Sequence, residues 1–461
     1  MALKCKLNPP PPLLPANLLR PGQLIKLIQG RNAGYGGDPP PGSLLAVSGQ
    51  RRSSYWPVQD LLTGSQFTLL EEGARIIRPT KREAQAYRDN VRDRLLNGQL
   101  EPYQGLGHNV GTDPEIFAIQ PNGQVIPAWE FLPDKGRPLD FGVDPKFYSG
   151  SYNSQNRAFW DGFQAEFTVR PWTCLAALVD FIQAGLKAVR TAARKKFPEA
   201  ELTAHCVLET PPPLLAVCPE EGVRLGCDPS YNAYSGGSNP ALMDLNPLEL
   251  PFRFAGLHIH LGCGELREDQ AAPLVKVIDK IAGVASVLIF RGLEDARRRQ
   301  YYGLAGEYRL PSHGLEYRVI SSWGLAHPVL THLVFDLVRM SHAFAVRGYG
   351  PIWECTDEEA QQAINGLDYE LAGKIIERNR ALLTALLRSA YRSHISNESG
   401  DSSRKPKDRA APKAERLIFE GAAQLLDTSN LAKNWKLHDG ETWERHSDAD
   451  RVSLANWEFK E

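Results

Sequence analysis

The stretch that most constrains the fold is a short segment in the middle of the chain, Gly256 to Gly262, which reads GLHIHLG. Apolar and polar residues alternate along it, which predicts a half-buried β-strand. Because successive side chains of a strand point to opposite faces, His258 and His260 share one face. Two imidazoles side by side suit a metal or phosphate site. The ordinary alternative is a pair of polar residues on a wet sheet face.

The composition is that of a soluble globular protein. The chain has 461 residues, of which 42% are hydrophobic and 23% charged, so we expect two or three domains with a sizeable core. A net charge of -1 provides no basic field, so neither nucleic acid nor a membrane surface is an expected partner. The seven cysteines have no Cys-x-x-Cys spacing, no stretch approaches the apolar length of a membrane span, and the start carries no secretion signal pattern. We therefore expect a cytoplasmic protein with reduced thiols.

The chain divides by composition into five parts. Residues 1–20 form a proline-rich extension, and residues 21–80 hold short apolar runs separated by Gly and Pro, which predict a small β-barrel that could dock a protein partner. Residues 81–107 predict a connecting helix and loop. Residues 108–395 alternate strand-like and helical pieces, which predicts one α+β or α/β domain, and residues 396–461 form a polar linker and tail. Within the large domain we expect helices over 175–197, 271–294, 328–346 and 371–392.

Two further strand-like segments carry acids in the same i, i+2 rhythm. Asp113 and Glu115 share a face if their segment is extended, and Pro114 between them favours an edge strand or a strand start. Glu166 shares a face with Gln164, opposite large apolar residues. Each pattern also has an ordinary explanation, a turn with solvated acids in the first case and an acid on a wet sheet face in the second.

A fourth segment adds a guanidinium group. Glu316 and Arg318 share a strand face, either as a cross-strand ion pair or as a metal ligand beside a phosphate clamp. Upstream, Arg297–Arg299 are expected at a solvated helix end, and the segment from Tyr302 to Arg309 could be a flexible loop that brings Arg309 to a polyphosphate. Together the four segments predict a site for divalent ions and a nucleoside triphosphate.

The joint pattern resembles the phage-type carboxylate–amine ligase family, type 2, a branch of the amidoligases with the glutamine synthetase-like fold. The resemblance covers about residues 108–395. It is carried by six motifs: DPE at 113–115, DG-x-x-x-EF at 161–167, CDP-x-x-x-A at 227–233, G-x-HIH-x-G at 256–262, RR-x-x-YG-x-AG-x-x-R at 298–309 and EYR at 316–318.

The resemblance implies a curved, mainly antiparallel sheet with helices on one side and a ligand-binding concave face. It implies ATP and Mg²⁺ as cofactors, with Mn²⁺ as an alternative because an imidazole joins the oxygen ligands. The implied metal ligands are Asp113, Glu115, Glu166, His258 and Glu316. The implied ATP-binding residues are Arg299, Arg309 and Arg318, and the implied catalytic residues are Arg318, Arg309 and His260.

Asp113 departs from the related glutamate–cysteine ligases, which have glutamates on the first strand. A side chain this short could bind an ion only through water, or not bind it at all.

The reaction implied by the resemblance is ATP-dependent formation of an amide or peptide bond through an acyl phosphate. Its substrates would be a small-molecule or peptide carboxylate and an amine. Two alternatives stay open at this point. One is a metal-dependent hydrolase with zinc on His258, His260 and a carboxylate. The other is a non-catalytic scaffold that retains the ligase fold.

Overall fold

The computed structural model describes most of the chain, in two compact units. One unit holds residues 1–102 and 343–353, and the other holds residues 103–342 and 354–461. The described residues are 14, 19, 23–30, 38–39, 43–47, 55–60, 66–70, 72, 74–100, 109–143, 156–223, 230–237, 248–399, 410–437 and 459. Cys227 to Pro229, most of the polar linker, and Trp443 and Trp457 of the tail therefore lie outside the described residues.

The described strands of the smaller unit form a five-stranded antiparallel sheet in the order β4-β3-β2-β1-β5. Their bounds are β1 (Leu24–Gln29), β2 (Leu44–Val47), β3 (Tyr55–Gln59), β4 (Gln66–Leu70) and β5 (Arg75–Ile77). The inward side chains, among them Ile25, Trp56 and Val58, make a buried apolar cluster. The prediction of a closed barrel is wrong, because the short β5 pairs with β1 and leaves β4 at the opposite edge.

Helix α1 (Lys81–Leu96) follows this sheet, where the sequence predicted a connecting helix. It begins at Thr80 because of a capping box: the Thr80 side chain accepts from the Glu83 N–H, and the Glu83 carboxylate accepts from the Thr80 N–H. The Glu83 carboxylate also pairs with Lys26 of β1 at 2.5 Å. The start of α1 is thereby tied to the sheet that precedes it.

The larger unit is built on a ten-stranded antiparallel sheet of described strands. Its main path is β13-β16-β17-β15-β6-β10-β9-β8, and β7 and β11 both pair with the end of β6. The bounds are β6 (Val110–Ile119), β7 (Val125–Ile126), β8 (Leu139–Asp140), β9 (Arg157–Asp161), β10 (Gln164–Trp172), β11 (Glu201–Thr203), β13 (Tyr231–Asn232), β15 (Leu257–Leu261), β16 (Glu307–Arg309) and β17 (Leu315–Tyr317). β12 (Val207–Glu209) and β14 (Phe252–Phe254) pair separately. The predicted α+β class and mainly antiparallel sheet are confirmed.

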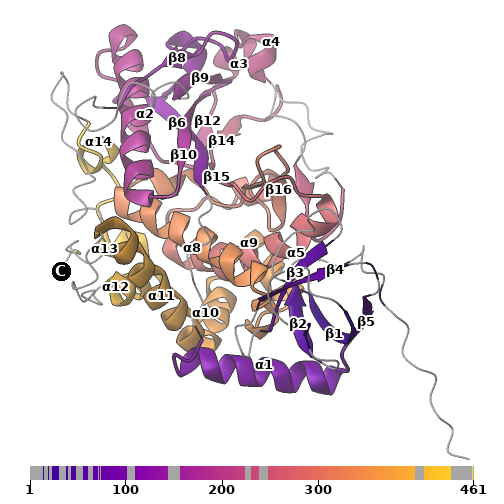
Figure 1. Ribbon diagram of the computed structural model, residues 1–461. Coiled ribbons are helices and arrows are strands. Elements are labelled where there is room, and N and C mark those ends of the chain that lie inside the picture. The colour runs from indigo at the N-terminus through magenta and orange to yellow at the C-terminus, as the bar shows by residue number, and fades with distance from the viewer. Residues whose placement is uncertain are drawn as a thin grey trace, which may run out of the picture. The chain divides into compact units, whose positions relative to one another are not determined.

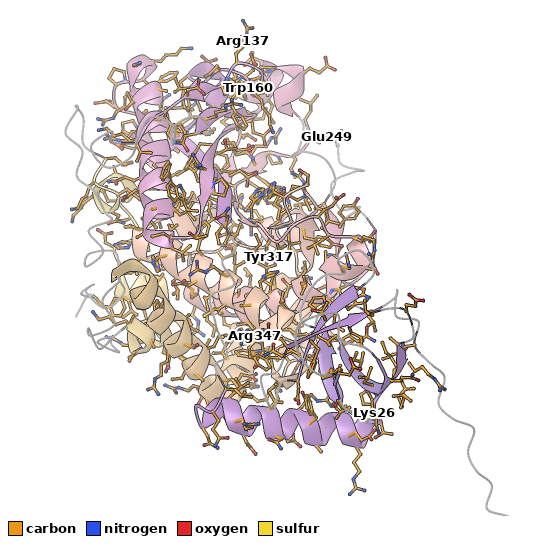
Figure 2. The ribbon with its side chains drawn as sticks, in the orientation of Figure 1. Lys26, Arg137, Trp160, Glu249, Tyr317 and Arg347 are labelled. Carbon is orange, nitrogen blue, oxygen red and sulfur yellow. The ribbon has the colours of Figure 1, made fainter. Side chains whose placement is uncertain are left out.

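Helices cover one face of this sheet (Figure 1). Phe167 of β10 packs so closely on α2 (Leu175–Lys196) that a Cβ on Gly185 would lie 2.3 Å from its ring. Tyr317 of β17, labelled in Figure 2, donates a hydrogen bond of 2.6 Å to Asp279. Asp279 begins the π-helical turn η5 (Asp279–Gly283), which joins α5 (Glu268–Ile278) to α6 (Val284–Ile289). Residues next to Phe167 and Tyr317 along the strands, such as Glu166 and Glu316, therefore point to the other face.

The remaining helices complete the described chain. They are α3 (Pro212–Ala216), α4 (Glu220–Val223), α7 (Arg298–Tyr301), α8 (Pro328–Val346), α9 (Asp357–Asn365), α10 (Tyr369–Arg378), α11 (Arg380–Ser399), α12 (Ala410–Glu420), α13 (Ala422–Leu425) and α14 (Leu431–Asn434), with short 3₁₀ turns η2 (Ala128–Glu130), η6 (Ser322–Leu325) and η7 (Gly350–Ile352). The helix predicted over 371–392 is divided at Asn379. The Asn379 side chain bonds the backbone N–H and C=O of Glu354, so it anchors the helix junction to a neighbouring segment.

Two expectations from sequence need correction. Pro114 lies inside β6, a central strand, rather than at an edge. The backbone N–H of its partner Leu257 points away from β6 and donates to the Ile320 carbonyl. Leu257 and Pro114 are therefore a pair without mutual hydrogen bonds, and β15 needs no N–H from the proline. Within the described residues, α8 is long and apolar enough to cross a membrane, contrary to the expectation that no stretch would be. Because 94% of its apolar window is buried in the protein, α8 has the burial of a core helix.

The C-terminal segment of the described chain packs on the larger unit through Trp435, which is fully buried. The Trp435 indole N–H donates to the Leu325 carbonyl at 2.6 Å, and its backbone carbonyl accepts from Gln183 of α2 at 2.7 Å. The sequence predicted a tail that follows a linker but did not indicate its docking site. That site is α2 together with η6, the turn just after β17.

Candidate functional site

Five neighbouring strands bring the predicted site residues to one face of the large sheet. Glu166 of β10 lies opposite Glu115 of β6, and His258 of β15 lies opposite Asp113 of β6. Further along the sheet, Glu316 of β17 lies between His260 of β15 and Arg309 of β16. Directly opposed residues of an antiparallel pair share a face. The acids, imidazoles and guanidinium groups therefore face the side that α2 and η5 leave uncovered.

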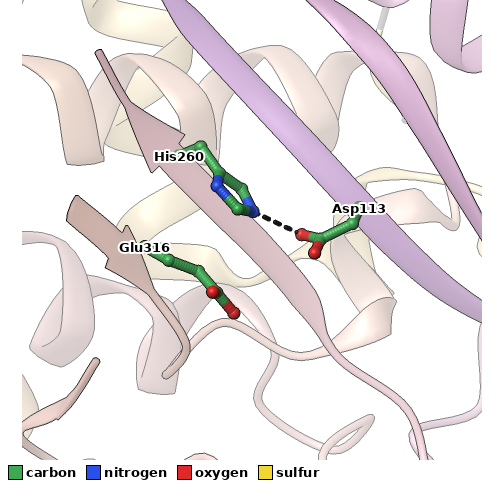
Figure 3. Close-up of side chains that lie close together, drawn as sticks. All are labelled: Asp113, His260 and Glu316. Atoms are coloured by element: carbon green, nitrogen blue, oxygen red, sulfur yellow. Dashed lines mark hydrogen bonds and ion pairs between the residues drawn. The ribbon is translucent and has the colours of Figure 1, made fainter. Parts of the chain in front are cut away.

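Within the described part of the chain, Asp113, His260 and Glu316 form a group suited to a metal ion (Figure 3). One ligand atom from each lies within 4.8 Å of the others, and His260 Nε2 is 2.7 Å from Asp113 Oδ1. Two carboxylates and one imidazole are a donor set that Mg²⁺ tolerates and Mn²⁺ accepts well. The resemblance placed His260 among the catalytic residues, whereas the geometry places it with the metal-ligand candidates.

His260 also connects this group to the protein surface. Its Nδ1 lies 3.0 Å from Nε2 of His313, an exposed residue in the turn before β17. The Asp113 carboxylate, His260 and His313 therefore form a chain from the candidate metal group to solvent. His313 carried no pattern in the sequence, because its neighbourhood to His260 arises only when β15 and β17 pair.

A second group lies beside the first and surrounds the hydroxyl of Tyr302. The Tyr302 oxygen is 3.1 Å from Glu115 Oε1, 2.5 Å from His258 Nε2 and 2.9 Å from Arg318 Nη2. Glu115 also accepts a bond of 2.7 Å from the Gly256 N–H. Sequence reasoning did not select Tyr302 as a site residue, although it stands in the motif RR-x-x-YG. Its role could not be predicted because its partners come from three other segments.

The three predicted nucleotide-binding arginines have different surroundings. Arg318 is buried, and its Nη1 donates to Glu316 Oε1 and lies 3.3 Å from His258 Nδ1. Arg309 Nη1 is 3.8 Å from Glu316 Oε1, and 20% of the Arg309 side chain is exposed. Both lie with the acids, and Arg309 is the more accessible to a ligand.

Arg299 lies elsewhere, with protein groups around it. It is buried, donates to the Val319 carbonyl at 2.9 Å and lies 3.5 Å from Glu294 Oε1. Arg298 is fully buried as well and donates to the carbonyls of Val319 and Ile320. The expectation of a solvated arginine helix end is therefore wrong for both residues, because Glu294 and the backbone carbonyls after β17 hold their guanidinium groups in the interior.

The segment between Tyr302 and Arg309 is held by specific hydrogen bonds, where the sequence suggested a flexible loop. Gly303 adopts φ +67°, and a Cβ there would lie 2.4 Å from the Arg298 guanidinium, so the turn requires glycine. The Gly303 N–H donates to Glu307 at 2.8 Å, and the Ala305 N–H donates to Asn365 at 2.7 Å. These bonds fix the approach of β16 and hence the place of Arg309.

Burial shifts three acids of the face, Glu115, Glu166 and Asp161, towards their neutral forms. It raises the pKa of Glu115 to about 8, against the opposing effect of Arg318, and the charge of Asp161 adds to the rise. Burial also raises the pKa of Glu166, with further contributions from Asp113 and Asp161. The pKa of Asp161 itself is raised by burial, against nearby Lys135 and Arg318. Asp161 stands in the DG-x-x-x-EF motif but was not predicted as a site residue. A cation at this face would stabilise these carboxylates as anions.

The two imidazoles respond to their surroundings in opposite directions. Burial and the neighbouring Arg318 hold the pKa of His258 well below its ordinary value. Burial also acts to lower the pKa of His260, but the charge of Asp113 and its hydrogen bond outweigh that effect, so the pKa of His260 is raised. Although the two histidines share one strand face, His258 stays neutral and His260 is more readily protonated.

Residues 250–392 match the model of the family described as phage phiEco32-like COOH.NH2 ligase-type 2. That segment carries the signature of this family. The match begins just before β14 and includes His258, His260, Arg309, Glu316 and Arg318, and it confirms over these residues the resemblance recognised in the sequence. No curated protein matches the chain.

The match implies a carboxylate–amine ligase, an enzyme class that forms amide bonds. It covers less than a third of the chain, and Asp113, Glu115 and Glu166 lie outside it. These three acids are joined to the family segment by strand pairing, since β6 pairs with β15 and β10 pairs with β6. Their roles as ligands stay predictions.

Proposed function

We propose that this protein is an ATP-dependent carboxylate–amine ligase that forms an amide or peptide bond through an acyl phosphate. The observation that carries the proposal is the pairing of β15 with β17 inside the matched segment. It sets His260, Glu316 and Arg309 side by side on the uncovered face, together with Asp113 from β6. An acid and imidazole group beside an accessible arginine suits a nucleotide bound with a divalent ion.

Asp113, His260 and Glu316 would hold Mg²⁺ or Mn²⁺, and their oxygen-rich donor set fits either ion. When bound, the ion would neutralise charge on the ATP phosphates. Glu115 and Glu166, buried and raised in pKa, are candidates for a further ion on the same face.

The guanidinium groups supply the phosphate contacts in this proposal. Arg309, partly exposed and 3.8 Å from Glu316, would hold γ-phosphate oxygens in its planar fork. Arg318 is fixed by Glu316 and Tyr302, so it would present a preorganised positive charge to the transferred group. An oxygen of the substrate carboxylate attacks the γ-phosphorus and ADP leaves. The amine nitrogen then attacks the acyl carbon and loses a proton, and inorganic phosphate leaves with the former carboxylate oxygen.

The zinc hydrolase alternative fits the geometry less well. Zinc on both histidines would need a free lone pair on each ring. His258 Nε2 lies 2.5 Å from the Tyr302 oxygen, and His258 Nδ1 lies 3.3 Å from the Arg318 guanidinium. A cation at either nitrogen would have to displace one of these partners, neither of which is an acid, whereas the partner of His260 Nε2 is Asp113, itself a ligand candidate. The scaffold alternative predicts that the face binds no nucleotide, so it is addressed by the same experiment as the ligase.

The test is ADP release by the full chain with Mg²⁺-ATP, screened against a panel of amino acids, dicarboxylates and short peptides, with and without ammonia or amino-acid amines. A ligase of this kind releases ADP over many turnovers only when both a carboxylate and an amine are present. Arg309→Lys should reduce that release about 10- to 1000-fold, as expected for loss of a preorganised donor. Arg297→Lys is the matched control, because Arg297 pairs with Asp295 at 2.7 Å, and its side chain is 41% exposed. Phosphate release that needs neither substrate would contradict the proposal.

A further inference from the structure

Tyr302 lies where three strands of the site meet. It follows α7 and faces Glu115 from β6, His258 from β15 and Arg318 from the chain after β17. Its ring is stacked on Phe254 with centroids 6.3 Å apart, and the Arg318 guanidinium lies over it at 5.4 Å. The approach is close: a Cβ on Gly256 would lie 3.0 Å from His258 Nε2 and 3.2 Å from Tyr302 Cε1. The hydroxyl is therefore confined to the point where the three partners converge.

The protons of this group can be assigned by counting donors and acceptors. A phenol has one proton and two lone pairs, and a guanidinium only donates. Arg318 Nη2, at 2.9 Å, donates to the Tyr302 oxygen, and Tyr302 donates to Glu115 Oε1 at 3.1 Å. His258 Nε2, at 2.5 Å, must then donate to the remaining lone pair.

A separate contact gives the same assignment for His258. Its Nδ1 lies 3.3 Å from Arg318 Nη1, which can only donate, so Nδ1 must carry a lone pair. A protonated Glu115 could instead donate to Tyr302, and Tyr302 would then donate to His258 Nε2. The contact of Nδ1 with Arg318 decides against that arrangement, because a neutral ring that accepts at Nδ1 carries its proton on Nε2. His258 is thus a neutral ring with its proton on Nε2. Its Nδ1 lone pair is on the side of Glu316 Oε1, at 3.5 Å, and Asp113 Oδ1, at 3.8 Å.

We propose that Tyr302 is a positioning residue of the site, whose hydroxyl holds the Nε2–H tautomer of His258 and the orientation of the Arg318 guanidinium. The expected effect of Tyr302 on turnover rests on the proposed ligase function, whereas the assignment of the His258 tautomer rests only on the contacts around Tyr302. The hydrogen bond with Tyr302 turns the Nδ1 lone pair of His258 towards Glu316 and Asp113. It also fixes Nη2 of Arg318, while Nη1 of Arg318 contacts both Glu316 and His258 Nδ1. Tyr302 would therefore orient His258 and Arg318 towards the substrate without contacting the substrate itself.

The proposal is tested by ¹⁵N NMR of the full chain labelled at histidine, with the His258 signals assigned by their loss in His258→Gln. At neutral pH the unmodified protein should show His258 as the Nε2–H tautomer, with an Hε2 proton protected from exchange. Tyr302→Phe keeps the ring and its stacking but removes the hydroxyl, so that proton should lose its protection. Tyr301→Phe is the matched control. Tyr301 packs on Phe252 and Phe254 one residue earlier, and the His258 signals should be unchanged.

The kinetic readout separates positioning from simple stability. Tyr302→Phe should lower kcat about 10- to 100-fold, as is typical when a group behind the direct ligands is removed, with a smaller change in KM for ATP. The melting temperature of the same preparation should stay near that of Tyr301→Phe. An Nδ1–H tautomer in the unmodified protein, or full protection of Hε2 in Tyr302→Phe, would overturn the proposal. If no variant releases ADP while the NMR results hold, the ligase function fails and the positioning role of Tyr302 stands.

Discussion

Asp279 is a buried carboxyl group that should make the stability of the protein depend on pH. Burial raises the pKa of Asp279 from 3.8 to about 7, although the hydrogen bond from Tyr317 opposes the rise. Between these values the folded state keeps a proton that the unfolded state has lost. The stabilisation is therefore complete below pH 3.8 and is lost as the pH rises through 7. The difference between these two pKa values corresponds to about 4 kcal/mol of unfolding free energy.

The test is Asp279→Asn, which still accepts from the Tyr317 hydroxyl but cannot ionise. Between pH 5 and pH 8 the unmodified protein should lose about 3 kcal/mol of unfolding free energy that the variant does not lose. Urea unfolding of both proteins at the two pH values measures the difference, and this subtraction removes the similar contribution of Glu115. Asp269→Asn, at an exposed acid of α5, should keep the slope of the unmodified protein. Equal slopes for the unmodified protein and Asp279→Asn would refute the reasoning.

Three further predictions concern the site and its support. Arg318→Lys cannot reproduce the fork that joins Glu316 and Tyr302, so ADP release should fall about 10- to 1000-fold with little change in ATP affinity; an active but less stable variant would mean that the ion pair is structural. Asp113→Asn should weaken Mn²⁺ binding in isothermal titration calorimetry, and unchanged affinity would remove Asp113 from the ligand candidates. Trp435→Ala should cost about 3–5 kcal/mol in urea unfolding, since it empties a fully buried position, and a loss below about 1 kcal/mol would contradict the anchoring role.

The sequence was most informative where a strand has one buried face. Alternation along Gly256–Gly262 predicted the shared face of His258 and His260, and the same rhythm predicted it for Glu316 and Arg318. A period of two leaves little freedom once one face is apolar, because a shift of one residue would expose the core side chains. The order of the strands could not be read in this way. The group formed by Asp113, His260 and Glu316 depends on β15 lying between β6 and β17.

Residues whose partners are distant in sequence were the hardest to predict. Tyr302 meets Glu115, which is 187 positions away, and nothing local to either residue indicates the contact. The arginine run predicts a solvated helix end and the resemblance implies ATP binding by Arg299, whereas Glu294 and the Val319 carbonyl hold Arg299 in the interior. Charge runs in a sequence do not distinguish a solvated helix end from a buried one, since burial of arginine depends on partners that tertiary structure supplies.

The small N-terminal sheet shows that sequence patterns predict strands better than they predict how a sheet closes. Its four longest strands, β1 to β4, lie on short apolar runs of the sequence, but closure into a barrel requires the first and last strands of the sheet to pair. The described β4 and β5 are instead the two edges, because β5 adds beside β1. Apolar runs and turn residues predict that strands exist, and they do not determine whether the sheet closes.

The most direct test of the ligase mechanism follows an oxygen atom. A carboxylate substrate found in the ADP-release screen is labelled with ¹⁸O at its carboxyl group, and the inorganic phosphate formed with Mg²⁺-ATP and the amine is analysed by mass spectrometry. The acyl-phosphate route predicts one ¹⁸O in each phosphate, because the carboxylate oxygen that attacked the γ-phosphorus leaves with it. Unlabelled phosphate formed together with the amide would contradict this route.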